Sequence, residues 1–243
     1  MHTVKRALIM AAGKGERLNP VTLDTPKPLV KVNGVRMIET SIEALKTNGI
    51  NDIYIVTGYK SEQFDVLKEK YPEIHFIHNK YYNDYNNISS LYVAREALEG
   101  DLMILDGDLV ISNPDILKPE FDRTGYNSIW TDEDTVEWLM QVDEEGTVKS
   151  CSRTGGKKGW ILLGISRWTA EDAAKLRKYL EYEFEQAENR QLYWDDVVMF
   201  QHFDKFSLGF REMKRSDVVE IDCYEELCER DPSYVNYIPK STQ

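Results

Sequence analysis

The sequence has few cysteine and histidine residues. Its three cysteines are Cys151, Cys223 and Cys228, and the chain holds only four histidines. The cysteines are odd in number and form no CxxC pair, whereas a disulfide framework needs paired cysteines and a zinc site needs closely spaced ligands. We therefore expect free thiols and no structural zinc.

The chain also lacks long apolar runs and an excess of basic residues. No stretch reaches the ~18 apolar residues of a membrane helix, and residues 1–6 lead into a strand-like segment instead of a signal-peptide core. The 30 lysines and arginines are outnumbered by 42 aspartates and glutamates, which gives the 243 residues a formal net charge of −12. Such a charge repels nucleic-acid phosphates and anionic membranes. These observations predict a cytoplasmic protein that binds neither nucleic acid nor membranes.

Apolar strands and amphipathic helices alternate in the first half of the chain. The spacing predicts strands over residues 4–10, 52–57, 74–78 and 102–105, and helices over 37–46, 61–70 and 88–98. Ser61 is the expected N-cap of the second helix. Because strands that alternate with helices form parallel sheets covered on both faces, this half is predicted to be α/β.

The second half of the chain is rich in short β-type segments separated by polar turns. We expect strands over residues 126–131, 136–142, 147–151 and 160–166, then helices over 169–184 and 195–201, strands over 208–213 and 218–221, and a helix over 224–230. The first four strands suit antiparallel pairing at one end of the main sheet. Residues 231–243 contain two prolines and little patterning, which favours a loose terminal segment or linker.

The strongest motif is AAGKGERL at residues 11–18, followed by TPKPL at residues 25–29. Small residues after a buried strand let backbone N–H groups approach a polyphosphate, and Arg17 and Lys27 can neutralise its charge. Residues 1–31 also hold more basic than acidic side chains, although the whole chain is acidic. The string ends without the Ser or Thr of a Walker A loop and lacks the third glycine of the dinucleotide fingerprint. It therefore predicts a triphosphate-binding loop of another kind.

Acidic and aromatic residues mark two further candidate sites. Pairs of carboxylates follow predicted strands at residues 106–108 (DGD) and 220–222 (EID), where they are either Mg²⁺ ligands or solvated turns. Rings adjoin carboxylates at residues 137–138 (EW) and 193–196 (YWDD). Electron-rich rings beside carboxylates suit a quaternary ammonium, although a single aromatic residue is more often part of the core.

Taken together, these motifs resemble a known enzyme family. The loop of residues 11–18 with TPKPL resembles the signature of nucleotidyltransferases, which transfer a nucleoside monophosphate from an NTP to a phosphorylated acceptor. The later EW, YWD and EID strings are similar to those of the bacterial CTP:phosphocholine cytidylyltransferase branch. The resemblance covers nearly the whole chain. It implies an α/β, Rossmann-like, mostly parallel sheet flanked by helices, of the nucleotide-diphospho-sugar transferase type, with a β-rich acceptor-binding insertion.

The resemblance also implies a division of labour along the chain. Residues 1–230 would form a single domain, with a nucleotide-binding half at 1–112, an acceptor-binding half at 113–230, and a tail at 231–243. The expected nucleotide site consists of Ala11, Ala12, Gly13, Gly15, Arg17, Lys27, Asn87, Ser89 and Asp106. The expected acceptor site consists of Trp138, Lys157, Tyr193, Trp194, Asp195 and Glu220.

The implied reaction transfers CMP from CTP to phosphocholine and releases pyrophosphate. Arg17, Lys27 and Asp108 are the expected catalytic residues, and Asp108 and Asp222 would bind Mg²⁺. A phosphate nucleophile is ionised at neutral pH, so the reaction needs no general base. Phosphoethanolamine, 2-aminoethylphosphonate and a sugar 1-phosphate are the alternative acceptors. A nucleotide-binding module without catalysis is the alternative from a different class.

Overall fold

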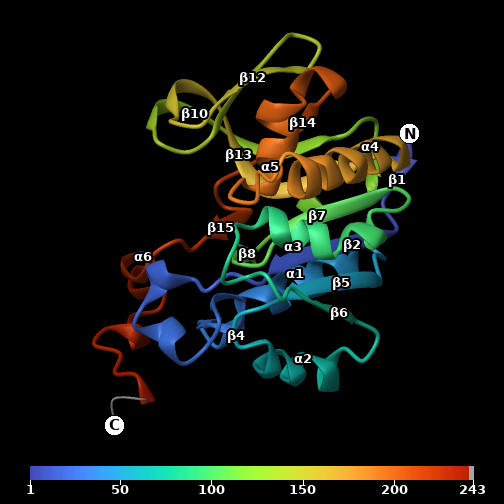
Figure 1. The fold of residues 1–243 in the computed structure, drawn as a ribbon. Helices are drawn as coiled ribbons and strands as arrows, with labels where there is room; N and C mark the ends of the chain where they lie inside the picture. The colour runs from blue at the N-terminus through green and yellow to red at the C-terminus, as the bar shows by residue number, and fades with distance from the viewer. Residues whose placement is uncertain (241–243) are drawn as a thin grey trace.

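A nine-stranded sheet forms the centre of the computed structural model, which describes residues 1–240 (Figure 1). The strand order is β12-β11-β13-β7-β2-β5-β6, and β10 pairs with both β13 and β14. The parallel part consists of β2 (Arg6–Ala11), β5 (Asp52–Thr57), β6 (His75–His78) and β7 (Leu102–Asp106). The remaining strands are β10 (Gly125–Thr135), β11 (Leu139–Val142), β12 (Val148–Ser152), β13 (Gly156–Trp168) and β14 (Gly209–Met213).

The β-rich part joins the parallel part through one antiparallel pair. Strand β13 runs antiparallel to β7, and Arg167 lies opposite Met103 in that pair. Strands β10 and β11 both pair antiparallel with β13, so the second half of the chain extends the same sheet. The predicted α/β class and the antiparallel extension at one end of the sheet are therefore confirmed.

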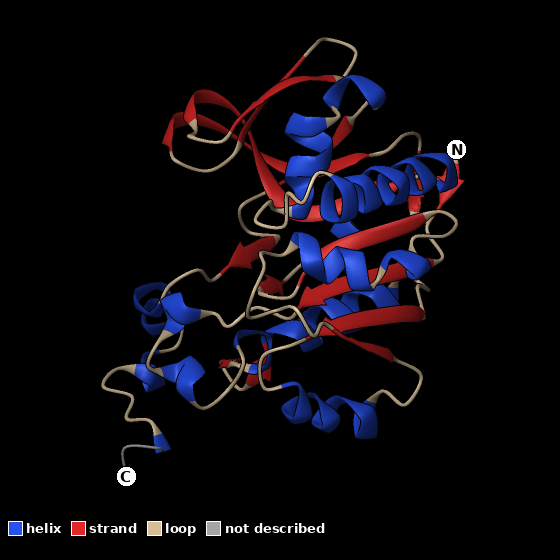
Figure 2. Ribbon diagram, viewed as in Figure 1, coloured by secondary structure: helices blue, strands red, loops and turns tan. Residues whose placement is uncertain are grey.

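Helices cover both faces of the sheet (Figure 2). Helices α1 (Met37–Thr47) and α2 (Asp65–Lys70) pack on one face, and α3 (Ile88–Val93), α4 (Ala170–Glu181) and α5 (Trp194–Asp196) pack on the other. An apolar core lies on each face of the sheet, and strand β2 contributes to both. Ile9 packs in the core beneath α1 and α2, and Leu8 packs in the core beneath α3, α4 and α5. Buried on both faces, such a strand reads as a continuous apolar run, which is why the sequence revealed it.

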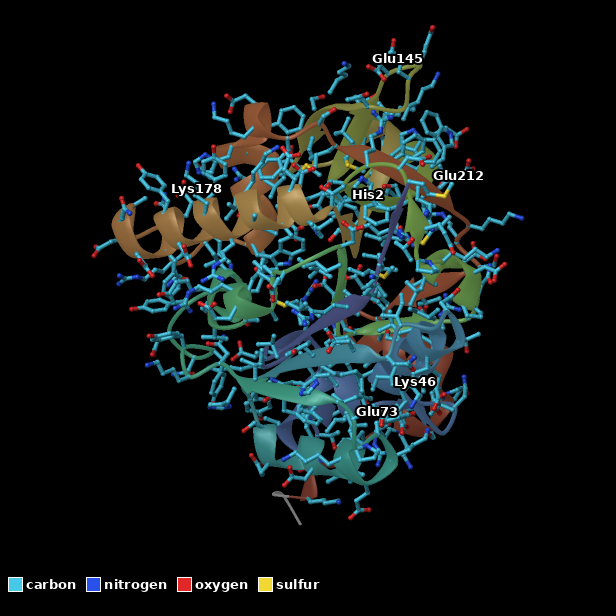
Figure 3. All side chains as sticks on the ribbon, turned by 90° about the vertical axis from the view of Figure 1, so that its right-hand side faces the viewer. His2, Lys46, Glu73, Glu145, Lys178 and Glu212 are labelled. Atoms are coloured by element: carbon cyan, nitrogen blue, oxygen red, sulfur yellow. The ribbon has the colours of Figure 1, made fainter. Side chains whose placement is uncertain are left out.

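Ion pairs on the surface tie neighbouring helices together. Figure 3 shows Lys46 of α1 beside Glu73, which follows α2, and the two side chains form an ion pair. The pair joins the two helices that cover the same face of the sheet. Glu145 lies at the far end of the β-rich part in the same view.

No helix within residues 1–240 is long and apolar enough to cross a membrane.

Three two-stranded sheets lie outside the main sheet. They pair β1 (His2–Thr3) with β9 (Glu120–Phe121), β3 (Lys31–Val32) with β4 (Val35–Arg36), and β8 (Leu109–Ile111) with β15 (Val218–Glu220). In the third sheet Leu109 lies opposite Glu220. This pairing brings the two acidic segments, 106–108 and 220–222, to the same place although more than a hundred residues separate them in the chain.

Short helical turns complete the described chain. The 3₁₀ turns are Glu16–Leu18, Val21–Leu23, Lys27–Leu29, Ser61–Phe64, Arg95–Ala97, Pro114–Leu117, Phe203–Lys205 and Pro232–Tyr234. Two π-helical turns, Tyr182–Gln186 and Val197–Gln201, continue α4 and α5, and α6 spans Tyr224–Arg230. The Thr169 side chain caps α4 by accepting a hydrogen bond from the Asp172 amide at 3.2 Å.

Two local predictions were wrong. Ser61 does not cap a helix: Lys60 adopts φ 48°, the Gln63 amide donates to the Lys60 carbonyl at 3.0 Å, and the α-helix begins only at Asp65. The tail over residues 231–240 is not loose, because the Tyr237 hydroxyl donates to Asp24 Oδ2 at 2.7 Å. The rest of the predicted tail, residues 241–243, lies outside the described residues. Figure 1 shows the red C-terminal segment beside the blue segment that follows β2.

Candidate active site

A cleft of about 780 Å³ opens where β2 and β7 end. Parallel sheets bind ligands at the carboxyl ends of their strands, because the following loops converge there. Four stretches of chain form its walls: residues 10–17, residues 82–90, the acidic strand ends, and the aromatic segments at 137–138 and 193–195. The cleft therefore collects nearly every motif that the sequence singled out.

The loop after β2 forms one wall of the cleft and depends on Gly15. Gly15 has φ 64°, a left-handed conformation that glycine adopts without strain. A β-carbon at this position would lie 2.7 Å from Cβ of Lys27. Gly15 therefore allows the buried Lys27 side chain to pass beneath the loop and reach the cleft.

Lys27 lies at the centre of a charged network. Its Nζ donates to Asp108 Oδ2 at 2.6 Å and to Asp222 Oδ1 at 3.3 Å. Arg17 donates to the same Asp222 oxygen at 2.7 Å. Burial alone would lower the pKa of Lys27, but the two carboxylates outweigh it and raise that pKa above its usual value. Lys27 therefore stays charged at neutral pH and holds the acidic strand ends together.

Three carboxylates form a cluster beside this lysine. Oxygens of Asp108, Glu220 and Asp222 lie within 4.8 Å of one another. Burial, followed by the charges of Asp108 and Asp222, raises the pKa of Glu220 to about 8. Oδ1 of Asp108 is buried and has no hydrogen-bond partner among residues 1–240. A hard divalent cation such as Mg²⁺ prefers oxygen ligands of this kind, so the three residues fit a metal site.

Asp106 occupies the floor of the cleft, where β7 ends. Burial, together with the charge of Asp108, raises its pKa well above the usual range for a carboxyl group. On the neighbouring strand β13, a β-carbon at Gly164 would overlap the Asp106 carboxylate. Glycine at position 164 therefore makes the space that this acid fills.

Aromatic rings and carboxylates form the opposite wall. The rings of Trp138 and Tyr193 are nearly perpendicular, at 86°, with centroids 6.0 Å apart. Glu137 and Asp195 line the cleft beside them. Burial raises the pKa of Asp195 to about 7, and its buried Oδ1 has no hydrogen-bond partner within residues 1–240. Burial and the charge of Asp222 also raise the pKa of Glu137.

This wall is supported by Asp196, which belongs to the YWDD motif, and by Arg153 and Phe200, which the sequence did not reveal. Asp196 accepts one hydrogen bond from the Tyr193 amide and another from Arg153 Nε, both at 2.8 Å. The Arg153 guanidinium also lies 3.8 Å from the ring centroid of Phe200, whose ring meets Trp138 edge-on at 5.2 Å. Arg153 belongs to an ordinary polar turn after β12, and no motif in the sequence distinguished it.

Fourteen of the predicted site residues line the cleft. They are Ala11, Ala12, Gly13, Gly15, Arg17, Lys27, Asn87, Asp106, Asp108, Trp138, Tyr193, Asp195, Glu220 and Asp222. Six further residues also line it: Lys14 and Glu137, which lie within the motifs at 11–18 and 137–138, and Tyr82, Asn83, Asn86 and Ser90. The polar, asparagine-rich composition of residues 79–90 was the available signal for four of these six.

Three predicted residues lie outside the cleft. Trp194 is buried in the core, where its ring stacks on Tyr126 at 6.3 Å, because it points inward from α5 while Tyr193 precedes the helix. Ser89 is buried below the cleft and accepts a hydrogen bond from the Asn79 amide group at 3.0 Å. Lys157 is exposed near the outer end of β13 and does not line the cleft, so its contact with the acceptor phosphate stays a prediction.

Comparisons with known proteins agree with this architecture. The model of a family described as nucleotidyl transferase matches residues 6–122. The 2-aminoethylphosphonate cytidylyltransferase of Lancefieldella rimae is 38% identical over 230 residues, which are 94% of this chain and 93% of that protein. The choline-phosphate cytidylyltransferase of Streptococcus pneumoniae is 36% identical over 221 residues, 91% of this chain and 94% of that protein. The solved structure of a CTP:phosphocholine cytidylyltransferase from Streptococcus pneumoniae superposes with a TM-score of 0.85 at 35% identity, covering 95% of this chain and 99% of that one.

Proposed function

Because the chain belongs to the nucleotidyl transferase family and is a cytidylyltransferase, we propose that it transfers CMP from CTP to phosphocholine, giving CDP-choline and pyrophosphate. The perpendicular ring pair of Trp138 and Tyr193 carries this assignment. A trimethylammonium group spreads its charge and donates no ordinary N–H hydrogen bonds, so aromatic faces beside carboxylates suit it better than carboxylates alone. In this proposal residues 1–112 bind CTP, and residues 113–230 supply the acceptor wall within one domain.

The residues around Lys27 perform the transfer. The loop of residues 11–17 binds the triphosphate through backbone N–H groups, and Arg17 and Lys27 stabilise the charge that develops on the leaving pyrophosphate. When bound at Asp108, Glu220 and Asp222, Mg²⁺ supplies Lewis-acid stabilisation of the phosphate charge. The acceptor phosphate is already ionised, so the residues need only orient it for in-line attack on the α-phosphorus.

A second acceptor, 2-aminoethylphosphonate, is favoured by one specific observation. Asp195 and Glu137 place two carboxylates in the lining of the cleft beside the ring pair. A primary ammonium donates N–H hydrogen bonds directly to carboxylate oxygens, whereas a trimethylammonium has no N–H to donate. The relative from Lancefieldella rimae is named for this acceptor.

Pyrophosphate release with CTP and a panel of acceptors tests the proposal. We expect phosphocholine to give a higher kcat/KM than 2-aminoethylphosphonate, phosphoethanolamine or a sugar 1-phosphate. A preference for either primary amine would overturn the choline assignment and leave the cytidylyltransferase in place. No pyrophosphate release with any acceptor would instead support a module that only binds nucleotide.

Trp138→Ala tests the ring pair itself. A cation–π contact contributes about 0.5–2 kcal/mol, so the phosphocholine KM should rise roughly 2- to 30-fold while the CTP KM changes little. Trp130→Ala is the matched control, because Trp130 lies outside the cleft and its side chain is partly exposed. Equal effects of the two substitutions would remove Trp138 from the acceptor site.

A further inference from the structure

A second cavity, of about 320 Å³, lies at the opposite end of strand β7 from the cleft. Its lining includes Arg167, which pairs with Met103 near the start of β7, whereas the cleft lies where β7 ends, at Asp106. The side chains of Arg123 and Arg211 also line it. The cavity is therefore separate from the residues that bind CTP and its acceptor.

Three neighbouring strands bring these arginines together. Gly125 of β10 lies between Arg167 of β13 on one side and Gly209 of β14 on the other. Arg211 lies two residues further along β14. A β-carbon at Gly209 would come within 2.7 Å of Nε of Arg123, which crosses above it. Gly209 therefore leaves room for the Arg123 side chain, and Gly125 leaves room for the backbone of β14 at Gly209.

The charge of Arg167 is buried without a compensating carboxylate. Arg167 is only 3% exposed. Its guanidinium N–H groups donate to neutral oxygens: Asn127 Oδ1, the Ile116 carbonyl at 2.5 Å and the Lys118 carbonyl at 3.3 Å. Burial and then the neighbouring charge of Arg211 lower the pKa of Arg167 well below its usual value. Buried charges in proteins are normally paired.

The other two arginines are arranged in the same way. Arg211 donates to the Lys118 carbonyl at 3.1 Å, so this one carbonyl accepts from Arg211 and Arg167 alike. Arg123 donates to Thr147 Oγ1 at 2.8 Å. Burial lowers the pKa of Arg211 even though Glu120 and Asp122, which also line the cavity, act in the opposite direction. Among residues 1–240, no carboxylate oxygen lies within the 4.0 Å of a salt bridge from any of the three guanidinium groups.

We propose that this cavity binds a small anion bearing one or two phosphate groups, held by Arg123, Arg167 and Arg211. Guanidinium groups match phosphate oxygens bidentately, and each keeps N–H groups beyond those bonded to the carbonyls. A water molecule takes up about 30 Å³ of liquid, so the cavity has room for phosphate or pyrophosphate with part of its hydration shell. This inference is independent of the acceptor proposed for the cleft.

Titration calorimetry with inorganic phosphate tests the site. The titrations use Lys27→Met protein, because that substitution weakens anion binding in the cleft. We expect saturable binding of one phosphate per chain. Adding Arg211→Gln should weaken it about 10- to 100-fold, which corresponds to losing one charge-assisted hydrogen-bonding group. Arg215→Gln is the matched control, since Arg215 is exposed and does not line the cavity.

Two further measurements keep the test decisive. If the Arg211→Gln protein fails to fold, Arg123→Gln tests the same loss of phosphate affinity. Turnover of CTP by a protein that carries only Arg211→Gln or only Arg123→Gln shows that this variant is folded. Pyrophosphate and acetate are titrated in parallel to identify the anion. Absence of saturable phosphate binding, binding unchanged by both substitutions, or equal affinity for acetate would each overturn the proposal.

Discussion

Replacing Lys27 by methionine should destabilise the fold through the carboxylates that it leaves behind. The lysine side chain is only 9% exposed, and its Nζ lies 2.6 Å from Asp108 and 3.3 Å from Asp222. Removing one partner of a fully buried ion pair typically costs about 3–5 kcal/mol. Asp108 and Asp222 are 21% and 25% exposed, and Arg17 still pairs with Asp222, so we expect a loss of about 2 kcal/mol.

The free energy of unfolding in urea, measured without divalent cations, checks this value. Lys31→Met is the matched control, because it removes the same charge from an exposed side chain four residues away. We expect the control to stay within about 0.5 kcal/mol of the unchanged protein. Equal unfolding free energies for Lys27→Met and Lys31→Met would refute the view that the ammonium holds the carboxylates together.

Mg²⁺ should partly reverse the effect of Lys27→Met. Without the ammonium, a divalent cation is the natural counterion of Asp108, Glu220 and Asp222. A ligand that binds only the folded state stabilises it by about 1.4 kcal/mol at ten times its Kd. The variant should therefore gain more stability from Mg²⁺ than the unchanged protein does. An equal or smaller gain would mean that lysine and metal do not share these carboxylates.

Three other predictions concern the walls of the cleft. The pKa of Asp195 is raised to about 7, so the folded state retains a proton that the unfolded chain releases near pH 4, and this group makes stability fall as pH rises from 4 to 7. Asp195→Asn should remove about 3 kcal/mol of that fall between pH 4.5 and 7.5, measured by urea unfolding at both pH values; the same pH dependence in the variant and the unchanged protein would contradict it. Arg153→Met should raise the acceptor KM about fivefold and leave the CTP KM unchanged, because it removes the hydrogen bonds that Arg153 donates to Asp196. Arg153→Lys should have an intermediate effect. A matching rise in both KM values would indicate general loss of structure. Gly164→Ala should cost about 1–3 kcal/mol in thermal or urea unfolding, because its methyl group overlaps the Asp106 carboxylate, and an unchanged stability would show that this carboxylate moves freely.

The strands of the main sheet were predictable because burial on both faces leaves a plain pattern. The predicted strand at 52–57 coincides with β5, and the predicted helix at 224–230 coincides with α6. The short strand β8, Leu109–Ile111, was not expected, because three residues carry too little pattern to separate a strand from a turn. Its partner β15 lies more than a hundred residues away, and local sequence does not specify such a pairing.

Neighbouring aromatic residues show a second limit of sequence reasoning. Tyr193 and Trp194 are adjacent and looked equally suitable for the acceptor wall. The structure places the first in the cleft and the second in the core, because the helix begins between them and turns their side chains apart. Arg153 and the arginines of the second cavity escaped notice for a related reason: each stands alone in the sequence and gains its neighbours only through the fold.

The pairing of β8 with β15 also has a consequence for the order in which the site comes into being. A ribosome makes the loop of residues 11–17, Lys27 and Asp108 early along the chain. Glu220 and Asp222 are made about a hundred residues later, and only the pairing of Leu109 with Glu220 brings them to Asp108. A nascent chain therefore carries this loop without its complete set of acidic partners until residue 222 has been made, and the cluster of Asp108, Glu220 and Asp222 cannot assemble before then.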